Sequence, residues 1–261
     1  MLAKAKPEIS IVVAVNDEAV LSRNLLQSPA IVAGQATLHT FYNQPSASRA
    51  YNLGIRQTTS ALVAFVHQDV YLPQSWIENL RLACQQLSAS DPDWAVIGAF
   101  GVQPNGLHAG TVWSSGLGRS LGSKLEVPVP VASVDELAII IRRDSKCIFD
   151  DELPSFHLYG TDIVQIARSK GRTSYVAHLP VIHNSRPIRG LGGGFAIAHK
   201  YMRRKWSRNL PVPTLTVPLT VSPFPLWRAR LRLFLSRRAR AARATPSTTS
   251  PQIIAKKLHY E

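Results

Sequence analysis

Short apolar runs alternate with amphipathic stretches through the first 90 residues. Apolar runs bounded by turn residues are typical of buried strands, whereas apolar residues at helical spacing predict helices. The pattern predicts strands at 8–15, 36–42 and 61–66, and helices from 16–18 to 25 or 26, over 48–58 and over 74–87. This alternation of strand and helix favours an α/β domain built on a mostly parallel, doubly wound sheet.

The pattern continues less regularly after residue 90. It predicts strands at 94–102, 137–141 and 175–182, a helix over 163–170 capped by Thr161 or Asp162, and an irregular Gly- and Ser-rich connection over 103–130. Gly116, Gly118 and Gly122 in that connection superficially resemble a phosphate-binding loop. No predicted strand leads into them and no helix clearly follows, so we interpret them as an ordinary loop.

Charge divides the chain into two unequal parts. The net charge is +14, but residues 163–261 hold 19 Lys and Arg against one acid, Glu261, whereas residues 1–162 hold 11 Lys and Arg against 15 acids. A nearly neutral body joined to a basic part indicates an anionic partner. Phosphorylated substrates, an anionic membrane surface and nucleic acid all qualify. We divide the chain into a domain at 1–205 and a basic tail at 206–261.

The basic tail is first Pro-rich and then amphipathic. Its prolines exclude regular structure over much of 211–225. A helix over 227–243 would place Trp227, Leu231, Phe234 and Leu235 on one face, largely flanked by Arg228, Arg230, Arg232, Arg237 and Arg238. This face suits an anionic membrane surface, or it packs on its own domain. Residues 245–251 have the composition of a disordered segment.

Targeting signals are weak. The first residues lack the apolar core of a signal peptide, and no apolar run is long enough to span a membrane. The only cysteines, Cys84 and Cys147, exclude a disulfide framework. We therefore expect a cytoplasmic protein, peripheral to the membrane if the tail binds lipid.

Polar residues follow the central strand directly, as His67-Gln68-Asp69. In open α/β sheets, ligands bind at the carboxyl ends of the strands. A carboxylate two residues from an imidazole is suited to hold a divalent metal and, through it, a diphosphate. The alternative is structural: Asp69 caps the next helix and His67 fills the rim.

Five segments together resemble one family. They are 10–16, Ser-Arg-Ala-Tyr-Asn-Leu-Gly at 48–54, Phe-Val-His-Gln-Asp-Val at 65–70, 149–162, and His183. In order and spacing they resemble the GT-A nucleotide-sugar glycosyltransferases of the family 2 type, in the branch whose aspartate motif reads His-Gln-Asp. The resemblance covers about residues 8–210. It implies a GT-A, Rossmann-like domain with a mostly parallel mixed central sheet flanked by helices.

The resemblance also implies site roles. Asp69 would bind Mn²⁺ or Mg²⁺ bridging the donor diphosphate, His183 would support the metal, and Asp162 would be the general base. The other expected donor-binding residues are Asn16, Glu18, Asn43, Asn52, His67 and Gln68. The chain departs from the family where Tyr42-Asn43-Gln44 replaces paired aspartates, and where His67 replaces the usual first aspartate of the metal motif.

The leading hypothesis is an inverting glycosyltransferase that moves a sugar from a nucleotide-sugar donor to a carbohydrate or lipid-linked acceptor in cell-surface polysaccharide or glycan assembly. Inversion requires a base for the acceptor hydroxyl and positive charge on the leaving diphosphate. The alternatives are a non-catalytic nucleotide-sugar or carbohydrate-binding module and, less favoured, a nucleic-acid-binding protein, for which no recognised motif is present. We expect residues 69, 162 and 183 to line one cleft at the edge of the sheet, and Asp69 and Asp162 on opposite faces of the molecule would exclude the enzyme hypothesis.

Overall fold

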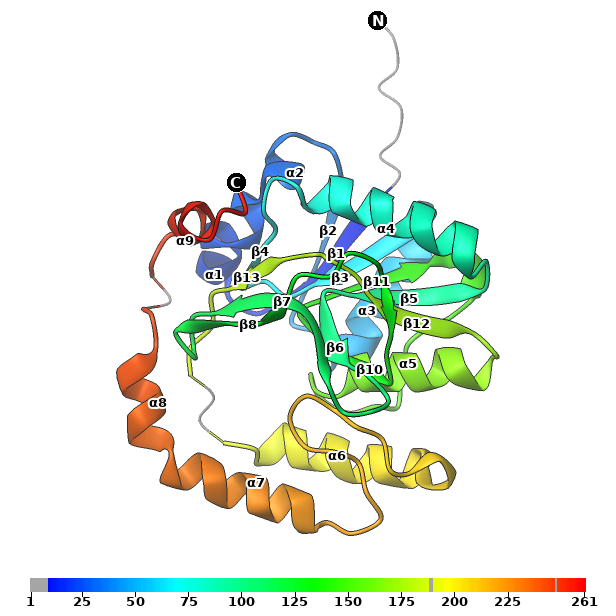
Figure 1. The fold of residues 1–261 in the computed structure, drawn as a ribbon, viewed down its shortest axis with the longest axis vertical. Coiled ribbons are helices and arrows are strands. Elements are labelled where there is room, and N and C mark those ends of the chain that lie inside the picture. The colour runs from blue at the N-terminus through cyan, green and yellow to red at the C-terminus, as the bar shows by residue number, and fades with distance from the viewer. Residues whose placement is uncertain (1–8, 188–189, 247) are drawn as a thin grey trace, which may run out of the picture.

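Two β-sheets with helices packed around them form the body of the protein (Figure 1). The structure is a computed structural model that describes residues 9–187, 190–246 and 248–261. The strands are β1 (Ile9–Val15), β2 (Thr37–Tyr42), β3 (Leu62–Val66), β4 (Val70–Tyr71), β5 (Trp94–Gly98), β6 (Phe100–Val102), β7 (His108–Ser114), β8 (Arg119–Ser123), β9 (Val129–Pro130), β10 (Ser133–Val134), β11 (Ala138–Arg142), β12 (Thr173–Val176) and β13 (Val181–His183). The helices are α1 (Glu18–Arg23), α2 (Pro29–Val32), α3 (Ala47–Gln57), α4 (Trp76–Ser90), α5 (Tyr159–Ser169), α6 (Gly193–Lys205), α7 (Phe224–Leu235), α8 (Arg237–Arg243) and α9 (Pro251–Lys257), with 3-10 turns at Leu25–Gln27, Arg143–Ser145 and Ser207–Asn209.

The larger sheet confirms the predicted α/β architecture. Its strand order is β2-β1-β3-β11-β5-β12-β9. The strands β2, β1, β3, β5 and β12 run in one direction, whereas β11 and β9 run opposite to them. The sheet is therefore mixed but mostly parallel. The carboxyl ends of β1, β2 and β3 meet at one edge, where ligands bind in folds of this kind.

The smaller sheet corrects three predictions. Its order is β10-β6-β7-β13-β4, with β8 paired to β7. The predicted strand at 94–102 breaks at Ala99 into β5 and β6, and the one at 175–182 breaks into β12 and β13, each pair shared between the two sheets. The connection at 103–130 is not irregular, because it forms β7, β8 and β9. Glycine suits this sheet: a Cβ at Gly122 would lie 2.0 Å from the carbonyl oxygen of Gly110.

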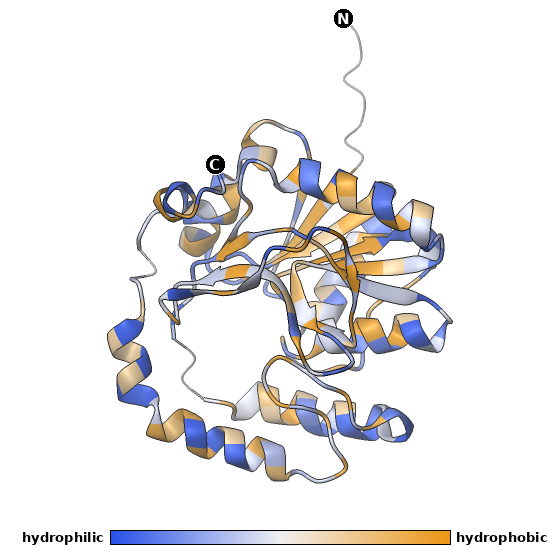
Figure 2. Cartoon of the chain, viewed as in Figure 1, coloured by the Kyte–Doolittle hydropathy of each residue, from blue (hydrophilic) through white to orange (hydrophobic). Residues whose placement is uncertain are grey.

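Side chains of the larger sheet alternate between two cores. Ile11 and Val13 of β1 pack on the side of α1, α2 and α4, whereas Val12 packs on the side of α3, α5 and α6. Alternation follows from the two-residue period of a strand, and burial on both faces explains the continuous apolar runs in the sequence. Apolar residues accordingly concentrate in the strands (Figure 2).

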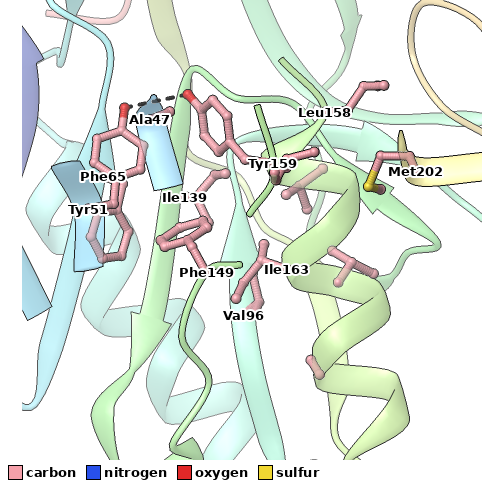
Figure 3. Close-up of a cluster of buried hydrophobic side chains, with 14 of the residues drawn as sticks. Ala47, Tyr51, Phe65, Val96, Ile139, Phe149, Leu158, Tyr159, Ile163 and Met202 are labelled. Carbon is pink, nitrogen blue, oxygen red and sulfur yellow. Dashed lines mark hydrogen bonds between the residues drawn. The ribbon is translucent and has the colours of Figure 1, made fainter. Parts of the chain in front are cut away.

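The second of these cores contains an aromatic cluster that reaches the edge of the site. The rings of Tyr51, Phe65, Phe149 and Tyr159 lie 4.9 to 5.9 Å apart, centre to centre. Figure 3 shows the hydroxyls of Tyr51 and Tyr159 joined by a hydrogen bond of 3.4 Å. Both phenols carry their polar ends to the rim of the core, which lets a packed cluster support polar groups above it.

The helix α5 starts earlier than predicted. It begins at Tyr159, so Thr161 and Asp162 lie within its first turn rather than capping it. The residue before it, Leu158, has a left-handed φ of +66°. Left-handed backbone is uncommon for Leu and is concentrated at constrained sites. Gly160 also lies against β10 so closely that a Cβ there would be 2.5 Å from the Val134 carbonyl oxygen.

The C-terminal part forms an arc along one side of the body, from α6 through α7 and α8 to α9 (Figure 1). The predicted helix at 227–243 is interrupted at Ser236, which separates α7 from α8. Where the sequence predicts disorder at 245–251, the Thr245 N–H donates to the Ser115 carbonyl at 2.8 Å, and α9 then begins; residue 247 lies outside the described residues. Ile254 and Ala255 of α9 pack on the smaller sheet. Among the described helices, none combines the length and apolarity needed to cross a bilayer.

Candidate active site

Three side chains that could hold a metal ion converge where the two sheets meet. His67 and Asp69 occupy the turn between β3 and β4, and His183 is the last residue of β13. The register of β4 on β13 pairs Val70 with His183, which brings the preceding Asp69 beside it. A backbone hydrogen bond from the Asn184 N–H to the Asp69 carbonyl, 2.8 Å long, ties the two segments together.

The geometry of this trio fits a metal ion. One ligand atom from each of His67, Asp69 and His183 lies within 4.8 Å of the others. His183 Nε2 is 3.3 Å from Asp69 Oδ2, and His67 Nδ1 is 3.9 Å from Asp69 Oδ1. Two imidazoles and one carboxylate suit Mn²⁺ and later transition metals better than Mg²⁺, which prefers oxygen. The sequence prediction that Asp69 caps the next helix is wrong, because Ser75 is the residue preceding α4.

Tyr159 fixes the orientation and tautomer of His67. Its hydroxyl donates to the Glu136 carbonyl oxygen at 3.0 Å and lies 2.6 Å from His67 Nε2. A phenol has one proton to give, so Nε2 of His67 must carry the proton of that second bond. The other ring nitrogen, Nδ1, then keeps its lone pair on the side of Asp69, as a metal ligand requires.

Burial and electrostatic interactions within the trio determine the protonation state of each of its side chains. Burial opposes the ionised form of Asp69, but His183 and then His67 hold the pKa of its carboxyl well below the usual range. Burial likewise opposes the charged form of His183, yet Asp69 raises the pKa of that imidazole. Burial lowers the pKa of His67. The carboxylate is therefore anionic, and His67 is the neutral imidazole of the pair.

Gln68 joins the exits of β1 and β3. Its side-chain oxygen accepts the backbone N–H groups of Asn16 and Asp17 at 3.0 and 3.2 Å, and its amide donates to Asn16 Oδ1 at 2.5 Å. Gln68 and Asn16 both border a cavity of 490 Å³ at this edge of the sheet. Asn43, with a left-handed φ of +50°, also borders it. Other lining residues include Ala14, Gln44, Tyr51, His67, Asp69 and Phe156.

Two further cavities open from the trio. One of 340 Å³ is bordered by Arg23 and Arg186 together with Asp69. The other, of 520 Å³, extends from His67 and His183 toward the tail and reaches Leu233 of α7 and Arg240 of α8. Asp69 borders all three cavities. It thus lies where three compartments of different chemistry meet.

Two acids of the 520 Å³ cavity were missed by sequence reasoning. Asp135 and Glu136 lie between β10 and β11 and both border it. Glu136 accepts the Leu158 N–H through Oε1, at the start of α5. Burial and then the Asp135 charge raise the pKa of Glu136 to about 8. The available signal was two adjacent acids directly before an apolar strand, but no family motif marks them.

Asp162 borders none of these three cavities, whereas we expected it to line one cleft with Asp69 and His183. Its side chain is 1% exposed. Trp206 Nε1 donates to Oδ1 at 2.7 Å and Lys205 Nζ to Oδ2 at 2.8 Å. Lys205 also binds Asp150 at 2.6 Å. Burial raises the pKa of Asp162 although Lys205 opposes the shift. The carboxylate is enclosed in a clamp between α5 and the end of α6.

Asn52 and Glu18 also lie apart from the cavities. Asn52 is buried, donates to the Phe149 carbonyl at 2.8 Å and to Asp151 at 2.9 Å, and accepts the Phe149 N–H at 2.9 Å. It therefore anchors the segment after β11 to α3. Glu18 is exposed in the first turn of α1, after the cap formed by Asp17. The structure thus brings together Asn16, Asn43, His67, Gln68, Asp69 and His183 of the predicted residues.

Comparison with known proteins gives a limited likeness. No protein-family sequence model matches the chain. One curated protein, "ATP synthase subunits region ORF 6" of Fuscovulum blasticum, is 28% identical over 158 residues, which is 57% of this chain and 61% of that protein. The chain therefore matches less than two thirds of that relative's length.

Solved structures similar to the chain carry names of sugar-transfer proteins among others. They include the mannosyltransferase PcManGT from Pyrobaculum calidifontis in complex with GDP-Man and Mn²⁺ (TM-score 0.47, 10% identity, 97% of this chain and 76% of that one). They also include GalNAc-T7 with UDP, GalNAc and Mn²⁺ (0.46, 10%, 99% and 59%), and TarS of S. aureus (0.46, 15%, 78% and 40%). Because TM-scores below 0.5 do not fix a function, the site itself must carry the functional conclusion.

Proposed function

We propose that the protein is an inverting glycosyltransferase that uses a nucleotide-sugar donor. The observation that carries the proposal is the position of Asp69, a depressed-pKa carboxylate that borders three cavities beside two imidazoles. A transfer enzyme needs a donor compartment and an acceptor compartment that meet at the reacting bond. The resemblance of the motifs 10–16, 48–54 and 65–70 to family 2 sequences supports the same assignment.

The donor fits the polar side of this junction. The 490 Å³ cavity, with Asn16, Asn43 and the exposed ring of Phe156, offers amide groups and an aromatic surface for a nucleoside. The adjoining cavity offers the guanidinium groups of Arg23 and Arg186, which match the geometry of phosphate oxygens. The nucleoside would occupy the first cavity and the diphosphate would lie toward the second.

A divalent metal fits the trio of His67, Asp69 and His183. Bound there, it would supply positive charge for the diphosphate as it leaves. The chain's own residues prepare the site: Tyr159 fixes the tautomer of His67, and the Asn184 backbone holds Asp69 against His183. The donor set leads us to propose Mn²⁺ rather than Mg²⁺.

Glu136 is the residue that we assign as the general base. It borders the acceptor-side cavity and not the diphosphate-side cavity, which Arg23 borders and which Arg186 shares with the acceptor side. Inversion requires the base and the leaving group on opposite sides of the sugar. The Leu158 N–H occupies Oε1 and leaves Oε2 for an acceptor hydroxyl. Once ionised, which its raised pKa of about 8 sets near that pH, the carboxylate would take the hydroxyl proton as the oxygen attacks the anomeric carbon and the nucleoside diphosphate departs. This assignment replaces Asp162, which no hydroxyl reaches in its clamp.

The acceptor cavity has a mostly apolar wall that includes Leu117, Leu121, Leu191, Phe195 and Leu215. Apolar lining suits a sugar carried on a lipid better than a free polysaccharide chain. We therefore propose a lipid-linked carbohydrate acceptor and a role in cell-surface glycan assembly at the cytoplasmic face of a membrane.

A donor screen tests this function. Thermal shift of the full chain with a set of nucleotide sugars, with and without Mn²⁺, should show one donor class that raises the melting temperature only when Mn²⁺ is present. Released nucleoside diphosphate is then measured with that donor. Donor binding with no release, alone or with lipid-phosphate acceptors, would favour the binding-module alternative. Failure of every nucleotide sugar to bind would reject both.

A further inference from the structure

The helix α7 presents two opposite apolar faces. On one face, Leu226 is buried and Ala229 and Leu233 pack on the main core. Arg230 secures this face by donating to the Leu191 carbonyl at 3.1 Å. The other face exposes five large apolar side chains, each 44 to 75% exposed: Phe224, Trp227, Leu231, Phe234 and Leu235. The sequence analysis left open that this exposed set packs on its own domain. That alternative is excluded, because Leu226, Ala229 and Leu233 on the opposite face make the contact with the domain.

The exposed residues form a continuous stripe. At the helical period of 3.6 residues they fall within an arc of about 100° around α7. The rings of Phe224 and Trp227 are stacked 5.7 Å apart, so the stripe starts with an aromatic pair. Scattered exposed apolar residues are ordinary on protein surfaces, but a contiguous set marks an interaction site.

Cations surround this stripe. Arg228 and Arg232 are exposed along one of its edges, and Arg237, Arg238 and Arg243 are exposed on the adjoining α8. The sequence from 163 to 260 contains no Asp or Glu to neutralise them. Figure 2 shows hydrophilic and hydrophobic residues interleaved along α7 and α8 at the outside of the arc.

An anionic bilayer is the partner that satisfies both features. Its interior takes the apolar stripe and its headgroups take the guanidinium groups, as for helices that lie in a membrane interface. Nucleic acid would match the cations but leave the five apolar side chains in water. A second copy of this face would oppose arginine to arginine, which is repulsive.

We propose that α7 and α8 dock the protein on an anionic lipid surface, with the stripe from Phe224 to Leu235 inserted among the headgroups. The side of α7 turned inward contributes Leu233 to the wall of the 520 Å³ cavity, and α8 contributes Arg240. The same two helices thus touch the membrane and the acceptor cavity. The docking proposal depends only on the exposed surface of α7 and α8. The delivery of a lipid-linked acceptor into that cavity depends also on the proposed function.

Vesicle flotation of the full chain tests the docking. We expect binding to vesicles of phosphatidylcholine with phosphatidylglycerol and little binding to phosphatidylcholine alone, with binding weakened by added salt. The double variant Trp227→Ser/Phe234→Ser should weaken binding at least about tenfold, because it removes two large inserted side chains. The variant Arg228→Gln/Arg238→Gln should weaken binding to the anionic vesicles only.

Matched controls lie elsewhere on the surface. Val32→Ser/Leu107→Ser removes two side chains that are 73% and 62% exposed outside the tail, and Arg119→Gln/Lys124→Gln removes two exposed cations of the body. Both should bind vesicles as the wild type does. Equal loss in the controls, or equal binding to both vesicle types, would overturn the proposal. A concentration-dependent dimer in light scattering that is abolished by Trp227→Ser/Phe234→Ser, without vesicle binding, would overturn it in favour of self-association.

Fluorescence places the stripe in the bilayer directly. Trp227 is 59% exposed, whereas Trp76 and Trp94 are buried. Vesicles containing brominated lipid should quench the wild type strongly and Trp227→Phe only weakly; equal quenching would place the contact elsewhere. Donor hydrolysis in solution is measured in parallel, since none of the substituted tail residues borders a cavity. Lost vesicle binding with intact hydrolysis separates failure of docking from failure of the proposed enzyme.

Discussion

Two aspartates of this protein, Asp69 and Asp162, show how surroundings decide what a carboxylate does. Asp69 is 24% exposed, faces two imidazoles, and borders three cavities. Asp162 is 1% exposed and is bonded by an ammonium and an indole. Imidazoles can give up a proton to accept a metal, whereas Lys205 fills the space beside Asp162 with its own fixed charge. The first arrangement is open to ligands, and the second is a structural clamp.

The largest expected effect follows from Asp69→Asn. The substitution keeps the size of the side chain but removes the negative charge of the metal site, so turnover of the donor should fall about a thousandfold. Titration calorimetry should show loss of Mn²⁺ binding as a readout independent of turnover. The control Asp93→Asn, a surface carboxylate paired with Arg172, should leave both unchanged. Unchanged Mn²⁺ affinity in Asp69→Asn would remove the trio from the metal assignment.

Glu136→Gln should lower transfer by about a hundredfold, the lower end of the usual contribution of a general base. The affinity for donor and for Mn²⁺ should stay within about twofold, because Glu136 lies on the acceptor side. Glu126→Gln, at a carboxylate that is 87% exposed, is the control. Transfer at the wild-type rate by the Glu136 variant would exclude it as the base.

Asp162→Asn should lower the free energy of unfolding and leave the rate of transfer nearly unchanged, in contrast to the substitution of Asp69. Neutralising one member of a buried ion pair leaves Lys205 less well compensated, although Asp150 still contacts it, so we expect a loss of about 2–4 kcal/mol in the free energy of unfolding. Urea unfolding measures this loss, and turnover per folded molecule should stay within a few-fold. A stable Asp162→Asn variant that cannot transfer would restore Asp162 as the base that the sequence motif implies.

Tyr159→Phe should weaken Mn²⁺ binding about tenfold to a hundredfold, because the hydroxyl that fixes the tautomer of His67 is lost. Tyr175→Phe removes a hydroxyl that bonds Asp91 and serves as the control. Calorimetry on both variants provides the comparison. Equal affinities would show that the tautomer of His67 is fixed in some other way.

The smallest effect concerns pH. The Glu136 carboxyl holds its proton up to about pH 8 when folded, but releases it near pH 4.5 in the unfolded chain. Between these values the unfolded state binds fewer protons, so Glu136 lowers stability as pH rises. The free energy of unfolding of Glu136→Gln should therefore be about 1–3 kcal/mol higher than that of the wild type at pH 8.5, and the two should be equal at pH 4. Urea denaturation at each pH measures this difference. A constant difference across this range would contradict the raised pKa.

Local pattern predicted much of the larger sheet because its strands are buried on both faces. The runs at 8–15 and 61–66 became β1 and β3 almost as expected. The smaller sheet was missed because β7 depends on pairing with β13, β8 depends on pairing with β7, and both contain glycines that fit close contacts, none of which shows in a local pattern. A break such as that at Ala99 likewise depends on which sheet each half joins.

The site was predictable where side chains follow parallel strands. Asn16, Asn43 and His67 meet because β2, β1 and β3 are neighbours, and that follows from the topology. The family resemblance added His183. Glu136 was missed because its role depends on the left-handed Leu158 and on the close approach allowed by Gly160. The enclosure of Asp162 could not be predicted, because Lys205 and Trp206 lie more than 40 positions away in the sequence.

The position of the trio between the two sheets has a mechanical consequence. His67 and Asp69 follow β3 of the larger sheet, whereas His183 ends β13 of the smaller one, and the Asn184 N–H donates to the Asp69 carbonyl at this point. A cation bound by His67, Asp69 and His183 together would cross-link the two sheets. Removal of the metal by a chelator should then loosen the contact between the two sheets first. Amide hydrogen exchange at Asn184 should become faster before exchange at the centre of any strand does.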